Sequence, residues 1–269
     1  MLPKLISIGS FFIPTYGTLV AIAFLAALWI VVGLARRASL PSESITNLVI
    51  YCALAGLAGA KLFMILFDFP TYWNDPLSLF SLSTLQAAGV YQGGFLVALV
   101  TAVLYMRRQH LPILATSDVF APGIALGQAI GRIGCFSAGC CWGSATHVPG
   151  AVTFHNPQAA ELTGVPLGIP LHPAQLYESV ADALIFAFLY FRIGKTHTAG
   201  TIFGWYLALY STARFIIEFF RFHEQGLHYG LSYTQWISLA TLAAGVALLI
   251  LRRGTAKLAF GGKPVHSST

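Results

Sequence analysis

The sequence predicts an all-α, polytopic membrane protein with seven transmembrane helices, its N-terminus outside and its C-terminus in the cytoplasm. Of the 269 residues, 57% are hydrophobic and only 9% are charged, and the mean hydropathy is +0.73. A soluble domain has about 25% charged residues, so the composition excludes an ordinary soluble protein. Apolar runs long enough to cross a bilayer recur along the chain, and basic residues gather in alternate connecting segments.

Seven apolar runs are the expected membrane spans, because about twenty apolar residues in a helix cross the hydrocarbon core. The third run has about sixteen residues and is short for a span. In order, the runs are residues 16–35, 45–67, 91–106, 115–136, 174–191, 199–220 and 232–251.

The distribution of basic residues predicts the orientation. With the N-terminus outside, the outer segments hold only Lys4 and Arg221, and the spans hold Lys61, Arg132 and Arg214. The inner segments hold the rest, namely Arg36, Arg37, Arg107, Arg108, Arg192, Lys195, Arg252, Arg253, Lys257 and Lys263. This is a strong positive-inside bias. The net charge of +6 is therefore a topology signal, and it requires no nucleic-acid partner.

The seven-span domain is expected to cover residues 1–253, followed by a short cytoplasmic tail, 254–269, without fixed structure. Two long outer loops, 68–90 and 137–173, are rich in Pro, Gly, Asn and Ser, and such loops can carry amphipathic pieces on the membrane face. We expect no cleavable signal peptide. The sequence shows no internal repeat, so it gives no support to a transporter built from repeats.

The stretch from Gly131 to Gly143 concentrates unusual residues at the end of the fourth run. It contains Arg132, three of the four cysteines and four glycines. A charge at membrane depth is costly, so an arginine there indicates a functional site. The alternative is a structural arginine that snorkels or pairs with a helix end.

Other charged residues in the spans are candidates to act with Arg132. Arg214 and Glu218 are four residues apart and share a helix face, where they could form a local ion pair. Glu178 could pair with Arg132 or with Arg214 from another helix. Because guanidinium groups match phosphate oxygens in a two-pronged way, two arginines near the outer leaflet predict a phospholipid headgroup as ligand.

Cys135, Cys140 and Cys141 are expected at the outer face. We interpret them first as inert or disulfide-bonded, since the outer compartment is oxidising. A nucleophilic thiolate assisted by Arg132 is the second reading. Metal binding comes third, because the Cys-x4-Cys-Cys spacing matches none of the common zinc patterns. We therefore predict no metal ion and no cofactor.

Glycines and a histidine complete the candidate set. Gly93 and Gly94 follow Gln92 at the start of the third run. Close helix packing is the commoner use of glycine in membranes, and backbone contact with an anion is the other. His172 precedes Pro173 at the start of the fifth run, where it is either a general base or an exposed loop histidine.

Two stretches are specific enough to indicate a family. They are Gly131-Arg132-Ile133-Gly134 with Trp142-Gly143, and His172-Pro173-Ala174-Gln175-Leu176-Tyr177-Glu178 with Arg214-Phe215-Ile216-Ile217-Glu218-Phe219-Phe220-Arg221 beyond it. Weaker landmarks are Tyr16-Gly17, Gly59-Ala60-Lys61 and Gly93-Gly94-Phe95. With these in the same order, the chain resembles the prolipoprotein diacylglyceryl transferase family over nearly its whole length.

The resemblance implies transfer of a diacylglyceryl group from phosphatidylglycerol to the lipobox cysteine of a preprolipoprotein, with release of glycerol phosphate. The reaction would take place in the bacterial inner membrane, at a site facing the outer leaflet. Carried over by position, Arg132 and Arg214 hold the lipid phosphate, with Tyr16, Tyr210 and Glu218 around them. We expect further lipid contacts from Gln92, Gly93, Gly94, Gly134 and Gly143.

The chain departs from the family pattern at several positions. Gln92 stands where the family usually has histidine, and Lys61 where it tends to have arginine. Cys135, Ala138 and Cys140 stand where it usually has Asn, Asn and Glu. The resemblance implies that this histidine is the usual candidate for the base, and glutamine cannot replace it. His172 or a thiolate such as Cys140 is the candidate replacement. The alternatives are another acceptor, or a lipid-binding or transport protein without transferase activity.

Overall fold

The computed structural model describes residues 4–8, 11–81, 84, 89–222 and 227–253. The predicted tail, 254–269, lies outside these residues. Seven long helices coincide with the seven apolar runs: α1 (Thr15–Arg37), α2 (Ser42–Phe67), α5 (Tyr91–Arg108), α6 (Ile113–Ala138), α8 (Ala174–Ile193), α9 (Thr201–Glu218) and α10 (Tyr233–Arg252).

Four of these helices, α1, α2, α6 and α10, are long and apolar enough to cross a membrane. Large apolar side chains on the helices are exposed, among them Leu25, Trp29, Leu57, Phe191 and Leu251, each more than 60% exposed. An extended apolar surface of this kind is unfavourable in water and favourable in lipid. The protein is therefore a helical membrane protein.

The remaining elements are short. They are β1 (Lys4–Ile8) and β2 (Phe11–Pro14), which pair antiparallel, then α3 (Phe69–Asn74), the 3-10 helix η1 (Pro76–Phe80), β3 (Val152–Thr153), α7 (Pro157–Thr163) and β4 (Pro170–Leu171). The chain divides into two compact units, Leu40–Ile113 and the two segments Met1–Ser39 and Leu114–Thr269. Each unit is described by itself below.

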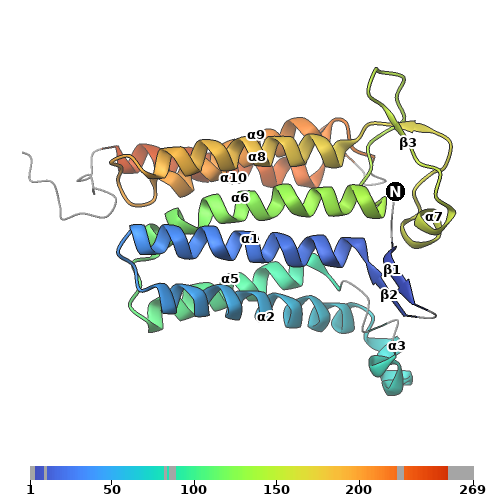
Figure 1. Cartoon of the computed structure of the whole chain (residues 1–269), viewed down its shortest axis with the longest axis horizontal. Helices are drawn as coiled ribbons and strands as arrows, with labels where there is room; N and C mark the ends of the chain where they lie inside the picture. Colours follow the sequence, from blue (N-terminus) through green and yellow to red (C-terminus); the bar gives the residue numbers. More distant parts are fainter. Residues whose placement is uncertain (1–3, 9–10, 82–83, 85–88, 223–226, 254–269) are drawn as a thin grey trace, which may run out of the picture. The chain divides into compact units, whose positions relative to one another are not determined.

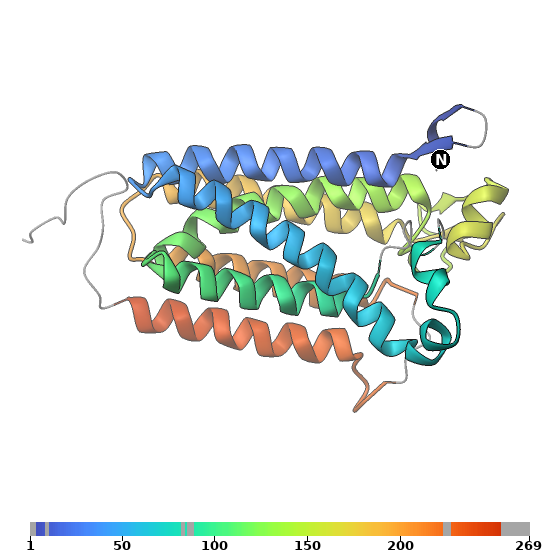
Figure 2. The ribbon, with the colours of Figure 1, turned by 90° about the horizontal axis from the view of Figure 1, so that it is seen from below.

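In the smaller unit, α2 packs closely on α5, as the two helices crossing in Figure 2 show. A Cβ added to Gly59 would lie 2.6 Å from Cβ of Val97 and 2.8 Å from the carbonyl oxygen of Gly93. A Cβ added to Gly94 would likewise lie 2.8 Å from the carbonyl oxygen of Gly56. The glycines let the two backbones approach, which is their usual role between membrane helices.

This close approach predicts that Gly59→Ala destabilises the protein. The added methyl group meets a Val97 carbon that cannot rotate away and a fixed backbone oxygen, and such overpacking costs about 1–3 kcal/mol. Thermal unfolding in detergent should show a lower midpoint. The matched control is Gly33→Ala on α1, where no atom lies within 4 Å. An equal midpoint for the two variants would contradict the prediction.

In the larger unit, α6 is the central helix and lies beside α1, α8 and α9 (Figure 1). Of the four most apolar helices it has the largest buried share. Ser179 Oγ on α8 donates to the carbonyl oxygen of Ala129 at 2.8 Å, and the Tyr206 hydroxyl on α9 donates to Gln128 at 2.9 Å. These polar contacts set the rotation of α8 and α9 about α6.

Asp118 joins α6 to the start of α9. Its carboxylate accepts hydrogen bonds from the backbone N–H groups of Gly200, at 2.7 Å, and Phe203, at 2.8 Å. An anion at this position satisfies free N–H groups and complements the helix dipole. Asp118 therefore has a structural role in this unit.

His197, in the loop before α9, lies beside this carboxylate. Its Nε2 is 3.6 Å from Oδ2 of Asp118, and its Nδ1 donates to the carbonyl oxygen of Lys195 at 2.8 Å. Burial lowers the pKa of His197, but its interactions with Asp118 and the Lys195 carbonyl outweigh burial and the nearby Arg192, so the pKa is raised. The folded state thus binds a proton more tightly than the unfolded state.

A raised histidine pKa contributes stability that is fully present below the unfolded value of about 6.5 and is lost as pH rises through the folded value. We therefore expect the thermal unfolding temperature of the wild type to decrease as the pH rises above about 6.5. His197→Gln should flatten that dependence, and His155→Gln, which alters an exposed histidine, should not. The same slope in all three proteins would contradict this assignment.

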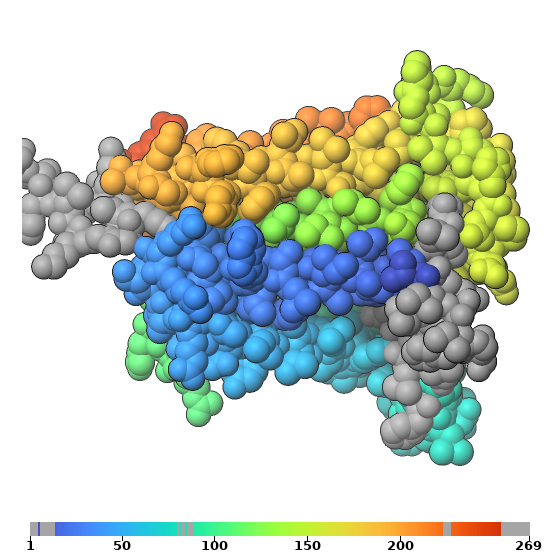
Figure 3. All heavy atoms as spheres, in the orientation of Figure 1, coloured from blue at the N-terminus to red at the C-terminus, as the bar shows by residue number. Residues whose placement is uncertain are grey.

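The segment between α6 and α8 has a small hydrophobic core of its own. Phe154, Ala159, Val165 and Leu171 are buried together. In Figure 3 this segment (yellow-green) gathers beyond the ends of α6 and α8. The predicted polar loop 137–173 is therefore a packed element that covers one end of these helices.

Candidate functional site

Glu178, near the start of α8, is the centre of a buried group of charged side chains. It forms ion pairs with Arg132 of α6, with Arg214 of α9 and with Arg221 just beyond α9. Nη1 of Arg221 donates to Oε1 of Glu178 at 2.8 Å, and Nη1 of Arg214 lies 3.6 Å from the same oxygen. The Glu178 side chain is only 4% exposed, so three guanidinium groups converge on one buried carboxylate.

Glu218 is the second acid of the group. Its Oε2 lies 2.6 Å from Nη1 of Arg214, and its Oε1 accepts a hydrogen bond from Ser232 Oγ at 3.0 Å. The sequence left open whether Arg214 pairs locally with Glu218 or across helices with Glu178. The structure forms both pairs at once. We call Arg132, Glu178, Arg214, Glu218 and Arg221 the arginine cluster.

The arginine cluster has donors to spare for an anion. Three guanidinium groups offer about fifteen N–H donors, and two carboxylates accept through about eight lone pairs. Asp182, one turn further along α8, is buried and interacts electrostatically with Arg132 and Arg214. Even this third acid leaves the donors in excess, so the cluster can bind a further anionic group such as a phosphate.

The sequence places Arg221 in an outer segment and does not include it among the candidate site residues. Its side chain is 17% exposed and is held in the cluster. It follows Arg214 by seven residues and Glu218 by three, so spacing on one helical face is the signal that could have found it. The sequence indicates Glu178 only as a pairing partner of the arginines, whereas the structure places it at the centre of the group.

Gly143 brings three segments together beside Arg221. Its N–H donates to the carbonyl oxygen of His172 at 3.0 Å, and it forms an isolated antiparallel bridge with Arg221. A Cβ at this position would lie 2.5 Å from the carbonyl oxygens of both His172 and Phe220. Close backbone approach therefore explains the glycine.

Tyr16 and Tyr210 surround the cluster. Tyr210 interacts electrostatically with Arg132, Glu178 and Arg214. Tyr16, 41% exposed at the start of α1, lies within electrostatic range of Arg132. A Cβ at Gly134 would lie 3.3 Å from Cβ of Leu19 and 3.4 Å from the Tyr16 ring, so α6 passes close to the start of α1 here.

His172 lies on the segment that Gly143 binds. Nδ1 of its ring is 3.2 Å from the Tyr177 hydroxyl, and the ring packs edge-on against Phe220 with centroids 5.2 Å apart. It is half-buried, unlike the exposed loop histidine that was the alternative. Within the described part of the chain, the His172 ring forms no contact with the carboxylate of Glu178 or Glu218.

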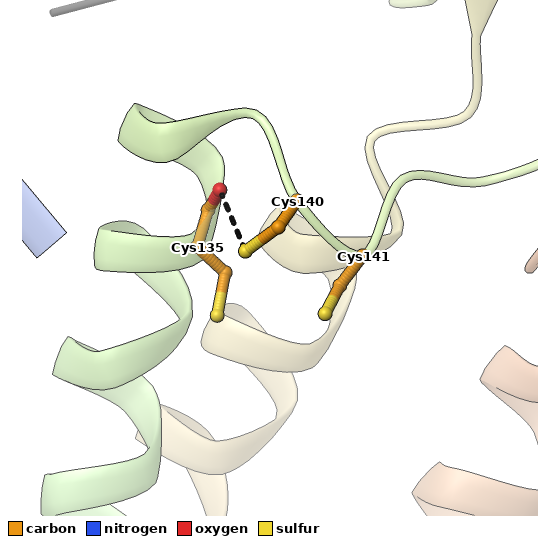
Figure 4. A group of neighbouring side chains, drawn as sticks. All are labelled: Cys135, Cys140 and Cys141. Atoms are coloured by element: carbon orange, nitrogen blue, oxygen red, sulfur yellow. Dashed lines mark hydrogen bonds between the residues drawn. The ribbon is translucent and has the colours of Figure 1, made fainter. Parts of the chain in front are cut away.

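The three cysteines come together next to the cluster. Cys135, Cys140 and Cys141 have their sulfur atoms within 4.8 Å of one another, and all three thiols are free. Figure 4 shows the side chains around the last turns of α6, with the Cys140 thiol donating to the Cys135 carbonyl oxygen at 3.7 Å. Below, these residues are called the cysteine cluster.

Cys141, which follows the end of α6, has a lowered thiol pKa. Hydrogen bonds from the thiols of Cys135 and Cys140 hold the pKa of Cys141 well below its usual range, and the charges of Arg221 and Arg132 act in the same direction. Cys140 has its pKa raised by hydrogen bonds within the cysteine cluster. Of the two, Cys141 is thus the better thiolate.

The remaining sequence-derived candidates lie in the smaller unit. Gly93 and Gly94 are buried between α2 and α5, where packing accounts for both, and Gln92 beside them is exposed. The Lys61 ammonium donates to the carbonyl oxygen of Thr84 at 2.5 Å. Lipid contact by Gln92, Gly93 and Gly94 stays a prediction.

The fold and the site define an integral membrane protein with a buried arginine–glutamate cluster suited to an anionic headgroup. A family model described as prolipoprotein diacylglyceryl transferase matches residues 3–251. The chain belongs to this family.

Relatives named phosphatidylglycerol–prolipoprotein diacylglyceryl transferase match over most of the chain. The protein from Clostridium tetani is 32% identical, covering 94% of this chain and 98% of the relative. Those from Bordetella parapertussis and Nitrosomonas europaea are each 33% identical, covering 92% of this chain and 94% and 88% of the relatives.

Proposed function

We propose that this protein transfers a diacylglyceryl group from phosphatidylglycerol to the lipobox cysteine thiol of preprolipoproteins, releasing glycerol phosphate. Its membership of the family and the names of its relatives support the reaction. The observation that carries the proposal is the arginine cluster, in which three guanidinium groups share two buried carboxylates and keep donors for a phosphate.

The protein acts in the bacterial inner membrane and crosses it seven times, with its N-terminus outside. Seven long helices and the concentration of Lys and Arg in alternate segments support this topology. In this orientation the arginine cluster faces the outer leaflet. Phosphatidylglycerol and a secreted preprolipoprotein reach the site from that side.

Arg132 and Arg214 bind the phosphate of the lipid, and Arg221 assists them. In the reaction, the acceptor sulfur forms a bond to the glyceryl carbon that carries the phosphate ester. The carbon–oxygen bond breaks, and its electron pair leaves on the phosphate. Negative charge grows on the phosphate oxygen as this bond breaks, and the positive arginines beside it stabilise the transition state. Tyr16, Tyr210 and Glu218 orient the arginines.

The proton of the acceptor thiol goes to a base on the protein. His172 is one candidate, since its half-buried ring lies on the segment joined through Gly143 to Arg221. A thiolate of the cysteine cluster is the other. Within that cluster, Cys140 is the residue that the sequence suggests.

A transfer assay with purified full-length protein, labelled phosphatidylglycerol and a lipobox peptide tests the proposal. The expected result is a thioether-linked diacylglyceryl peptide and an equal amount of glycerol phosphate. Folded protein that forms no thioether product contradicts the transferase function. Release of glycerol phosphate with a non-peptide product would instead assign another acceptor. Solute uptake without lipid turnover would assign transport.

A further inference from the structure

The cysteine cluster has three ligand atoms in one place. The sulfur atoms of Cys135, Cys140 and Cys141 lie within 4.8 Å of one another. A metal–thiolate bond is about 2.3 Å long, so three sulfurs around one ion in a plane are about 4 Å apart. Shifts of a few tenths of an ångström would bring the three sulfurs to that arrangement.

The backbone holds this arrangement from both sides. Gly139 and Cys141 both have positive φ angles, 82° and 59°, which turn the chain back along the last turn of α6. The N–H groups of Gly139 and Cys140 donate to the Cys135 carbonyl oxygen at 2.9 and 3.1 Å. The left-handed conformation is uncommon for cysteine and is maintained only where the surroundings impose it.

A contact with α8 fixes the loop further. The buried amide of Gln175 donates to the Cys140 carbonyl oxygen at 2.7 Å. The next residue but one after Cys141 is Gly143, which is bound to the segment of His172. The positions of the three cysteines are therefore set before any ligand arrives, which lowers the cost of binding.

A disulfide is less compatible with this geometry than a shared ligand. Neighbouring Cα atoms joined by a trans peptide are about 3.8 Å apart, and disulfides usually need about 4.4–6.8 Å, so Cys140 and Cys141 do not suit a mutual disulfide. A disulfide from Cys135 to either one would leave the third sulfur unused. One ion would engage all three.

The ligand set and its surroundings select the kind of ion. Among the described residues, this group of potential ligands contains only cysteine sulfurs, with no imidazole or carboxylate. Soft thiolates select Cu(I) or zinc, and a structural zinc site is almost always four-coordinate. A three-sulfur site around a monovalent ion carries two negative charges. Arg132 and Arg221, which both interact electrostatically with Cys141, offset them.

We propose that Cys135, Cys140 and Cys141 form a three-coordinate site for one soft monovalent metal ion, Cu(I). Binding forms three copper–sulfur bonds and releases the thiol protons to solvent, without any change in oxidation state. The site shares Arg132 and Arg221 with the proposed phosphate site, but its test measures metal uptake and does not require transferase activity.

The experiment titrates the reduced full-length protein with Cu(I) in detergent under anaerobic conditions, against a chromogenic Cu(I) chelator. The wild type should take up one equivalent, and copper X-ray absorption should show a shell of sulfur only. The triple variant C135S/C140S/C141S should lose this uptake. Cys52→Ser removes the one other cysteine of the chain, which lies in the smaller unit, and should retain the copper uptake.

Single variants keep the test decisive if the triple variant does not fold. Cys140→Ser and Cys141→Ser should each weaken binding at least about tenfold, because each removes one of three ligands. Equal uptake by wild type and these variants would overturn the site. Free thiols are counted in denatured protein that was purified without reductant. Two free thiols instead of four would show a disulfide in place of the metal site. Tighter binding of Zn²⁺ with an oxygen ligand would overturn the choice of Cu(I).

Discussion

Arg132→Ala should lower kcat/KM for diacylglyceryl transfer by about 10²–10³-fold, the usual cost of removing one donor that stabilises charge in a transition state. Arg132 is 24% exposed, the most accessible of the three clustered arginines, and Glu178 orients it. It is therefore placed to meet the phosphate directly. The measurement is thioether product formed from labelled phosphatidylglycerol and a lipobox peptide.

Two further variants separate phosphate binding from folding. Arg132→Lys keeps the positive charge beside Glu178 but lacks the planar fork, so it should fold normally and still lose about tenfold or more in rate. Arg36→Ala, which removes an exposed arginine at the end of α1, should leave the rate unchanged. Wild-type activity in Arg132→Lys and Arg132→Ala would remove Arg132 from the phosphate site.

Glu178→Gln should produce the largest loss of stability. The substitution preserves size but removes the carboxylate that three arginines share, and breaking a buried ion pair from one side costs about 3–5 kcal/mol. The midpoint of thermal unfolding in detergent should fall by about 10 °C. Intrinsic tryptophan fluorescence during heating provides the measurement.

Glu178→Asp and Glu161→Gln are the controls for this effect. Glu178→Asp keeps the charge with a shorter side chain, so its midpoint should lie between those of wild type and Glu178→Gln. Glu161 on α7 is exposed, and its substitution should change the midpoint little. A Glu178→Gln variant as stable as the wild type would contradict the stabilising role of the Glu178 carboxylate.

The glycines show where sequence patterns reach their limit. Gly93, Gly94 and Gly143 belong to motifs, and both lipid contact and packing were open readings for them. The structure places the first two against α2 and the third between two carbonyl oxygens. A glycine carries no side chain whose chemistry could decide between these roles, so only the neighbouring atoms reveal its packing.

Arg132 and Arg214 were predictable because a charge in an apolar run is visible in the sequence alone. Arg221 follows the end of α9 and looks like a surface residue, so only its spacing from Arg214 and Glu218 points to the cluster. Its place in the arginine cluster depends on the turn after Glu218 and on Glu178 from another helix. The same holds for the cysteine cluster, which requires the chain to turn back after Gly139.

The sequence by itself determined the helices, the membrane class, the family resemblance and the two arginines within the spans. Each of these rests on hydrophobicity, charge or a short motif, which are properties of neighbouring residues. Only the tertiary structure decided that Glu178 is shared by three arginines and that three sulfurs meet beside them. The Glu178 contacts join residues far apart in sequence and depend on how each helix is rotated against its neighbours, and the sulfur contacts depend on the turn of the chain after Gly139.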